Sequence, residues 1–278
     1  MKLADYPKGL DSFITFINKR KGMNLELYRR SFLSRRLKVR MDTCGTKDLL
    51  EYTNIIQRDH LEWDRFKDAL SINVSEFFRD REVFDFFHKH CLKRMIEDKK
   101  AKGQRTIRLW SAGCSCGEEA YSLAILLKES LGEKDQSDFL YHVYGTDVDL
   151  DALDKAKKGE FAKGSLKNVD QIILNKYFNR ISENSWQVNS EIKKIVFFQQ
   201  HNLMDPPPIK WVDIVFCRNV RIYFSNTDAE KVVCNINDVL RDKGYIVLGK
   251  VEILPVCLKK GLHDVKGYHK IFQKHNDK

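Results

Sequence analysis

Residues Ile107–Leu127 read IRLWSAGCSCGEEAYSLAILL and determine the fold class. The apolar run Ile107–Ala112 predicts a buried strand, the segment Gly113–Gly117 predicts a tight turn, and a helix is expected to begin at Glu118. A second strand, predicted over Leu140–Gly145, ends in Thr146 and Asp147. A strand, a glycine-bearing turn, a helix and a strand that ends in an acid are typical of an α/β fold that holds a nucleoside.

The residues of this turn indicate which kind of nucleoside it holds. Gly113 and Gly117 allow the backbone to approach a ligand closely, and Asp147 can accept hydrogen bonds from ribose hydroxyls. The dinucleotide fingerprint G-x-G-x-x-G is absent, and Glu118 and Glu119 at the helix start would repel a pyrophosphate. S-adenosylmethionine (SAM) carries an ammonium and a sulfonium, so the pattern predicts a SAM-dependent methyltransferase fold.

The regions on either side of this stretch define the domain organisation. After residue 103, strands alternate with helices, which indicates a mostly parallel Rossmann-like sheet. The first 84 residues instead show helical spacing, for example at Leu10, Phe13, Ile14 and Ile17. We therefore expect three parts. They are a helical domain over residues 1–84, a linker helix over 85–102, and a methyltransferase domain over 103–278 with a small inserted subdomain at 159–194.

Composition excludes several classes of protein. With 278 residues, 42% hydrophobic and 32% charged, the chain is globular, and it has neither an apolar run long enough to span a bilayer nor the apolar core of a secretory signal at its start. Seven scattered cysteines suit reduced thiols in a cytosol, and none has a partner at metal-ligand spacing. A cytoplasmic monomer that binds no metal is expected.

The net charge of +10 is concentrated near the start of the chain. Lys19–Arg40 holds nine basic residues and one acidic residue, Glu26. Arg29, Arg36 and Arg40 lie near one line of the helix expected over Leu25–Met41. A charge run of this kind is usually a solvated face, but its density indicates a docking surface for an acidic partner.

Four segments carry a specific resemblance. They are Asn73–Arg79 (NVSEFFR), Ser111–Ser122 (SAGCSCGEEAYS), Gly145–Asp149 (GTDVD) and Phe216–Phe224 (FCRNVRIYF). In this order they resemble the chemotaxis-receptor glutamate O-methyltransferase family (CheR-type), and the similarity extends over nearly the whole chain. The resemblance implies transfer of a methyl group from SAM to receptor glutamates, which gives glutamyl methyl esters and S-adenosylhomocysteine.

The resemblance also implies roles for individual residues. Arg79 and Tyr223 match the two residues that flank the transferred methyl group. The family's cofactor contacts correspond to Asn73, Ser75, Arg79, Glu119, Asp147, Asn202, Leu203, Arg218 and Asn219. Phe77 and Phe78 are expected to be plain core residues.

The sequence departs from the family pattern in several places: Ser75, Cys116 and Ala120 replace the usual threonine, threonine and proline, and two further departures bear on function. Lys250 and Val251 replace a histidine and a serine that the family commonly has before Glu252. Within the inserted subdomain, Asn179–Glu191 is short and lacks glycine, whereas members that bind a receptor's C-terminal tether peptide carry a longer, glycine-containing loop there. Tether binding is therefore not expected.

Two other functions remain open at this point. The net charge of +10 is compatible with a nucleic-acid methyltransferase, and Lys250 with a SAM-binding regulator that does not transfer methyl groups. The implied reaction needs no general base, because a glutamate with a pKa of about 4.3 is ionised at neutral pH. The helical methylation region of a receptor, rather than a nucleic acid, is the expected partner, with Arg29, Arg36 and Arg40 as its docking residues.

Overall fold

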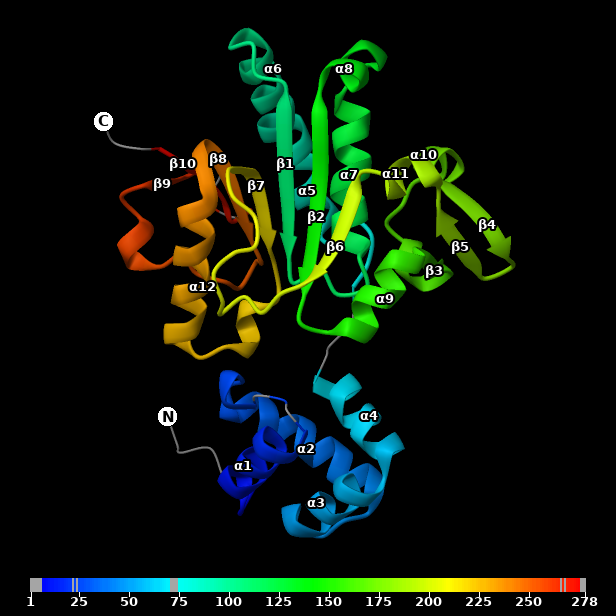
Figure 1. The fold of residues 1–278 in the computed structure, drawn as a ribbon, viewed down its shortest axis with the longest axis vertical. Helices are drawn as coiled ribbons and strands as arrows, with labels where there is room; N and C mark the ends of the chain where they lie inside the picture. The colour runs from blue at the N-terminus through cyan, green and yellow to red at the C-terminus, as the bar shows by residue number, and fades with distance from the viewer. Residues whose placement is uncertain are drawn as a thin grey trace. The chain divides into compact units, whose positions relative to one another are not determined.

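The structure is a computed structural model that describes residues 7–21, 23, 25–70, 75–265, 267 and 269–275. Its chain groups into two compact units (Figure 1). The first comprises Met1–Asn73 together with Ile222–Ala229, and the second comprises Val74–Arg221 and Glu230–Lys278. The chain therefore enters the first unit twice.

The first unit is helical. Its described elements are α1 (Leu10–Lys21), η1 (Leu25–Leu27), α2 (Arg30–Cys44), α3 (Leu49–Arg58) and α4 (His60–Leu70). The helical spacing of Leu10, Phe13, Ile14 and Ile17 is confirmed, since all four side chains are buried in one core. Burial of this apolar stripe, rather than intrinsic propensity, holds such short helices together.

Two expected helices have different ends in the structure. The helix expected over Leu25–Met41 is wrong in its first part, because Leu25–Leu27 is a 3₁₀ turn and α2 begins only after Arg29. The apolar residues Leu49, Leu50, Tyr52, Ile55 and Ile56 predict a second helix, Lys47 to about Lys67, which the structure interrupts at Asp59. The Asp59 carboxylate accepts hydrogen bonds from the backbone N–H groups of Leu61 (2.8 Å) and Glu62 (3.2 Å), which starts a new helix.

The segment Ile222–Ala229 is tied to the start of α2 within the first unit. Arg29 N–H donates to the Tyr223 carbonyl at 2.8 Å, and Tyr28 forms an isolated antiparallel bridge with Phe224. The Arg29 guanidinium donates to the Phe224 carbonyl and, at 2.9 Å, to Asn226 Oδ1. This short segment is therefore an integral part of the helical unit.

The second unit is built on a sheet of seven strands in the order β6-β2-β1-β7-β8-β10-β9. The first five strands in this order are parallel, and β10 is antiparallel to both β8 and β9. Their bounds are β1 (Thr106–Ala112), β2 (Leu140–Asp147), β6 (Val196–Gln200), β7 (Val212–Cys217), β8 (Leu240–Leu248), β9 (Leu262–Asp264) and β10 (Ile271–Lys274). The expectation of a mostly parallel sheet is confirmed.

The sheet has helices on both faces, with α5 and α7 behind it and α12 in front of it in the view of Figure 1. The helices are α5 (Arg81–Phe87), the π-helical turn η2 (His88–Leu92), α6 (Lys93–Ala101), α7 (Glu118–Ser130), α8 (Glu133–Asp138), α9 (Leu150–Lys158) and α12 (Asn226–Val239). Ile107 and Leu109 share a core with α5–α7, whereas Trp110 points to the opposite face and donates to Thr146 Oγ1 at 2.9 Å.

The insertion between α9 and β6 forms a small three-stranded antiparallel sheet in the order β3-β5-β4. It contains β3 (Glu160–Ala162), η3 (Lys163–Leu166), α10 (Gln171–Tyr177), β4 (Phe178–Ser182), β5 (Ser185–Val188) and α11 (Ser190–Lys193). Only Glu183 and Asn184 lie between β4 and β5, so the hairpin is tight. Phe161 and Phe178 pack edge-on against Phe77, which joins the insertion to the main core.

Candidate active site

The turn after β1 requires its glycines. Gly113 has φ +82° and Gly117 has φ +96°, and a Cβ on Gly113 would lie 2.4 Å from Cγ2 of Val220. The N–H groups of Gly113 and Cys114 donate to the Thr146 carbonyl at 2.8 and 2.9 Å. The turn is thus held against the carboxyl end of β2, at the edge where α/β sheets bind their ligands.

Asp147 is the last residue of β2 and is half-buried. Its Oδ2 accepts from Ser115 N–H at 2.8 Å and its Oδ1 from Asp149 N–H at 3.0 Å. Burial raises the pKa of Asp147 above its usual range, and hydrogen bonds from the backbone of Asp149, Ser115 and Val148 oppose the rise. Because a carboxylate can accept about four hydrogen bonds, capacity for a ribose hydroxyl remains.

Two further carboxylates lie at the start of α7. Glu119 Oε1 accepts from Ser111 Oγ at 2.7 Å, and its Oε2 lies 3.6 Å from Arg218 Nη1. Glu118 is 5% exposed, and its Oε2 has no hydrogen-bond partner among the described residues. Burial raises the pKa of both residues. An acidic oxygen without a described partner, at the same helix start as Glu119, suits a cationic ligand and would oppose a phosphate.

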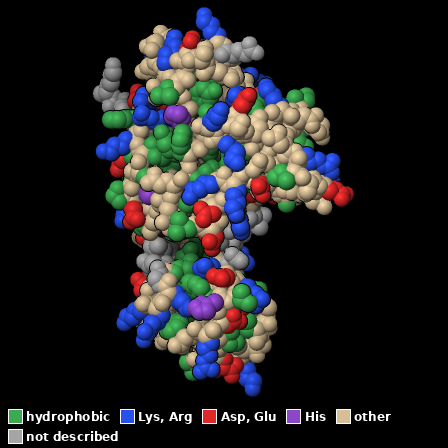
Figure 2. All heavy atoms as spheres, turned by 45° about the vertical axis from the view of Figure 1, so that its right-hand side comes forward, with side chains coloured by type: hydrophobic (Ala, Val, Ile, Leu, Met, Phe, Trp, Pro, Cys, Tyr) green, Lys and Arg blue, Asp and Glu red, His purple; other side chains and the backbone are tan. Residues whose placement is uncertain are grey.

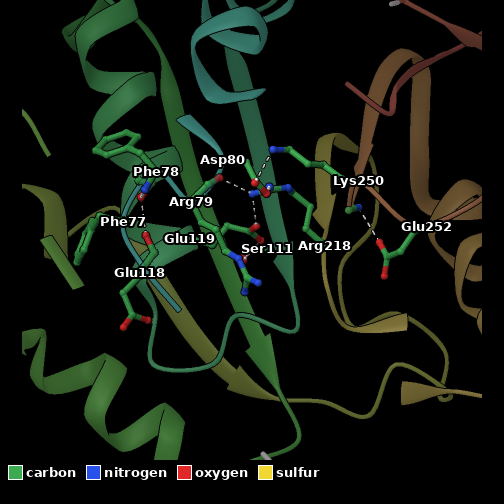
Figure 3. Close-up of polar contacts among 12 residues, drawn as sticks. Phe77, Phe78, Arg79, Asp80, Ser111, Glu118, Glu119, Arg218, Lys250 and Glu252 are labelled. Atoms are coloured by element: carbon green, nitrogen blue, oxygen red, sulfur yellow. Dashed lines mark hydrogen bonds and ion pairs between the residues drawn. The ribbon is translucent and has the colours of Figure 1, made fainter. Parts of the chain in front are cut away.

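Arg79 lies in a strained segment that leads into α5. Phe78 and Asp80, on either side of it, have φ of 51° and 58°, which is uncommon for residues other than glycine. Phe77 and Phe78 are buried, as expected, and Phe78 N–H donates to Ser122 Oγ at 2.9 Å. The positive charge of Arg79 lowers the pKa of Glu119 against the larger effect of burial. Figure 3 shows Arg79, Glu119 and Ser111 next to one another.

Arg218, at the end of β7, holds this segment in place. Its side chain is only 2% exposed; Nη1 donates to the Arg79 carbonyl at 3.0 Å, and Nη2 pairs with Asp80. Its guanidinium also lies 5.5 Å from the centre of the Phe84 ring. Arg218 Nε has no partner among the described residues. The expected cofactor residue Arg218 therefore also has a structural role, since it joins Asp80 and the Arg79 backbone to Glu119.

Lys250 extends this network from the end of β8. Its Nζ lies 2.8 Å from Asp80 Oδ1 (Figure 3). The same Nζ also pairs with Glu82. Burial alone would raise the pKa of Asp80, but Lys250 and Arg218 together lower it. The departure from the family pattern at Lys250 thus has a physical explanation, because the lysine fastens the Arg79 segment through Asp80.

Glu252 and the nearby backbone complete the carboxyl edge of the sheet. Its carboxylate accepts from Gly249 N–H at 2.6 Å and from Arg221 N–H at 3.0 Å. A Cβ on Gly249 would come within 2.9 Å of Asn219 N, and Asn219 itself has φ 60°. These contacts fix the turn that carries Arg218 and Asn219.

The remaining expected cofactor residues fall into three groups. His201 N–H donates to the Asp147 carbonyl at 2.9 Å, which brings the next residues, Asn202 and Leu203, to the same edge. Ser75 hydrogen-bonds Glu118 and lowers the pKa of that carboxyl against the larger effect of burial. Asn73 lies outside the described residues. Sequence reasoning missed Asp80, and it used Glu118 only to argue the charge of the ligand.

Tyr223 and the basic residues belong to the first unit. The Tyr223 ring packs 4.9 Å from that of Phe32, so its role beside the methyl group stays a prediction. Arg40 forms a bidentate contact with buried Glu62, to which Tyr52 also donates at 2.7 Å, and its side chain is 15% exposed. The expected row of three docking arginines is therefore corrected: Arg40 is an internal partner of Glu62, and Arg29 binds the returning segment.

Among the described residues there is no group of three or more His, Cys, Asp or Glu side chains placed to hold a metal ion. No helix of the described chain is long and apolar enough to cross a membrane.

The fold and the site define the class of protein. They are those of a class I SAM-dependent methyltransferase. The sheet is mostly parallel with an antiparallel last strand, a glycine turn follows β1, an acid ends β2, and carboxylates lie at the start of α7. The chain belongs to the CheR methyltransferase family, whose all-alpha domain matches residues 8–71 and whose SAM-binding domain matches residues 73–270.

Named relatives agree with this assignment. The chemotaxis protein methyltransferase of Borreliella burgdorferi is 30% identical over 249 residues, which cover 88% of both chains. The protein of the same name from Salmonella typhimurium is 31% identical and covers 85% of this chain and 80% of its own. Chemotaxis protein methyltransferase 1 of Pseudomonas aeruginosa is 32% identical, with 87% and 89% covered.

Proposed function

We propose that this methyltransferase transfers a methyl group from SAM to glutamate side chains of chemotaxis receptors in the cytoplasm, and that it does so as a monomer. The observation that carries the proposal is the position of Arg79, a half-buried cation on a strained segment, next to Glu119 at the start of α7. A guanidinium fork is suited to binding a carboxylate in a fixed orientation.

The residues of the site would divide the work as follows. Asp147 would hold the ribose hydroxyls, and Glu118 and Glu119 would hold the cationic end of SAM, which supplies an activated methyl group when bound. Arg79 would orient the acceptor carboxylate; the role of Tyr223, which belongs to the first unit, rests on the family resemblance alone. Since that carboxylate is already ionised, these residues need only align and desolvate it.

A transfer assay tests the proposal directly. Incubation of the protein with methyl-labelled SAM and receptor-bearing membranes should label the receptor, and mild base should release the label as methanol. A methylated nucleic-acid base would keep its label under the same treatment. Label on nucleic acid, or SAM binding without transfer to any receptor, would contradict the proposal.

The cofactor part can be tested separately at Asp147. An Asp147→Asn variant should bind SAM about 5- to 150-fold more weakly in titration calorimetry, because a charged acceptor for the ribose is lost at a cost of about 1–3 kcal/mol. Asp154→Asn is the matched control, because Asp154 is exposed on the helix that follows and pairs only with Lys157 at 3.3 Å among the contacts described. Equal affinity in both variants would exclude Asp147 as the ribose acceptor.

Receptor docking is proposed for three basic residues of α2. Arg35 and Lys38 are exposed, and the half-buried Arg36 lies over the Phe32 ring. Receptor methylation regions are helical and rich in glutamate, so a row of cations can pair with acids around the target residue. Each exposed pair contributes only about 0.2–1 kcal/mol, so several must act together.

Charge reversal tests this surface without disturbing the fold. A triple variant with Arg35, Arg36 and Lys38 changed to Glu should raise the apparent KM for receptor about 10-fold. Added salt should weaken docking of the wild type, and so reduce the difference in KM between the two proteins. Affinity for SAM should not change. Lys47→Glu, an exposed site between α2 and α3, serves as the control, and an unchanged KM in the triple variant would show that the acceptor docks elsewhere.

Tether-peptide binding is not part of the proposed function. The β4–β5 hairpin closes with a two-residue turn at Glu183 and Asn184, which supports the expectation from the short, glycine-free loop. Receptors that lack their C-terminal tail should therefore be methylated as fast as intact ones.

A further inference from the structure

Two cysteines lie with their sulfur atoms in contact in the second unit. Sγ of Cys234 on α12 is 3.8 Å from Sγ of Cys257 in the short helix η5 (Val256–Leu258), although the two residues are 23 positions apart. Both thiols are free. We propose that Cys234 and Cys257 form a reversible intramolecular disulfide, which makes this pair a thiol-modification site outside the methyl-transfer machinery.

The surroundings of the pair distinguish it from the other cysteines. Cys91, Cys114 and Cys217 are buried, and burial raises the pKa of each, that of Cys91 to about 12. A buried thiol with a raised pKa reacts slowly with solvent oxidants. Cys257 is the exposed cysteine of the described chain, and Cys234 touches it. Cys44 and Cys116 are half-buried, and burial raises the pKa of both, so a reagent in solution reaches Cys257 first.

The order of the chemical steps follows from the two environments. Burial and contact with Cys257 raise the pKa of Cys234, so the exposed Cys257 is the thiol that attacks a small-molecule disulfide such as oxidised glutathione. The Cys257 thiolate forms a bond to one glutathione sulfur and releases the other glutathione as a thiol. Cys234 then attacks Cys257, loses its proton and releases the second glutathione. The two cysteines lose two electrons in total, and the glutathione disulfide gains them.

The bond would fasten a loop that serves the site. The chain between β8 and η5 carries Lys250, which pairs with Asp80, and Glu252, which holds Gly249 and Arg221. Along this loop Val251 and Ile253 are 75% and 73% exposed, whereas Glu252 and Leu254 are 5% and 6% exposed, so exposed and buried side chains alternate. A covalent link from Cys257 to α12 anchors the far end of the loop and removes conformational freedom from the unfolded chain.

Oxidation with glutathione disulfide tests the proposal on the whole protein. The number of thiols titrated under denaturing conditions should fall from seven to five, and mass spectrometry should find the peptides of Cys234 and Cys257 joined. The midpoint of thermal unfolding should rise by about 5 °C and return after reduction. As a control, the affinity for SAM measured in the reduced state shows that the protein is folded.

Variants separate this pair from the other thiols. Cys234→Ser and Cys257→Ser should each lack the shift in unfolding temperature and the linked peptides, while Cys44→Ser, a cysteine of the first unit, should keep both. The proposal is overturned if oxidation leaves seven thiols, if glutathione stays on Cys257 alone, or if Cys257 instead joins two protein molecules. A temperature shift that persists in Cys234→Ser would overturn it as well.

Discussion

An Arg79→Ala variant should lose at least about 100-fold in the rate of methyl transfer to receptors while it folds as well as the wild type. The proposed loss is in orientation of the acceptor carboxylate, for which factors of this size are typical. Folding should be unaffected, because the segment is held by buried Phe77 and Phe78 and by the Arg79 carbonyl, none of which the substitution removes. Single-turnover transfer and thermal unfolding measure the two quantities.

Two further variants sharpen this test. Arg81→Ala is the matched control: Arg81 lies two positions away, its side chain is 48% exposed, and it contacts Asp85 and Asp170. It should transfer methyl groups at nearly the wild-type rate. Arg79→Lys keeps the charge but not the planar fork, so an intermediate rate is expected. Full turnover in Arg79→Ala would mean that Arg79 has no part in the reaction.

Replacing Arg218 should have the largest effect on stability. An Arg218→Met variant leaves Asp80 and Glu119 without their buried partner, which typically costs about 3–5 kcal/mol in the free energy of unfolding. The same change releases the Arg79 carbonyl, so affinity for SAM and methyl transfer should fall with it. Urea unfolding measures the stability, and calorimetry on the folded protein measures the affinity.

A double variant identifies the cause of that loss. If the Asp80 carboxylate, left with Lys250 as its partner, is responsible, adding Asp80→Asn to Arg218→Met should recover part of the stability, whereas additive losses would point to packing instead. Arg105→Met, at an exposed arginine, should change stability by no more than about 0.5 kcal/mol. An Arg218→Met variant as stable as that control would contradict the proposed role of the network.

The sequence predicted the turn after β1 well, because its determinants are local. Gly113, Gly117 and Asp147 belong to one strand–turn–helix–strand unit, and the positive φ at both glycines meets the expectation. The break at Asp59 was missed although its signal is also local, since an aspartate that caps the next helix can be recognised in a sequence. Apolar residues continue at helical spacing on either side of Asp59, and this spacing led to the prediction of one continuous helix.

The ion pairs of the site could not be predicted in the same way. Arg218 and Asp80 are 138 positions apart. Lys250 pairs with the same aspartate because it follows β8, which lies next to β7, the strand that Arg218 follows. Sequence alone marks these residues as charged but not as partners, because their pairing depends on strand order. Arg40 shows the same limit, since its partner Glu62 lies on another helix and turns an apparent surface charge into an internal one.

The return of Ile222–Ala229 to the helical unit bears on how this chain could be divided or recombined. A fragment that stops at residue 73 would lack the Tyr223 carbonyl that receives the Arg29 N–H, the Phe224 bridge to Tyr28 and the Asn226 oxygen bound by the guanidinium. In such a fragment the start of α2 would be exposed to solvent instead of bonded to the segment Ile222–Ala229. The helical unit is therefore not a transplantable module, and a chimera between relatives would have to exchange two separate stretches of sequence together.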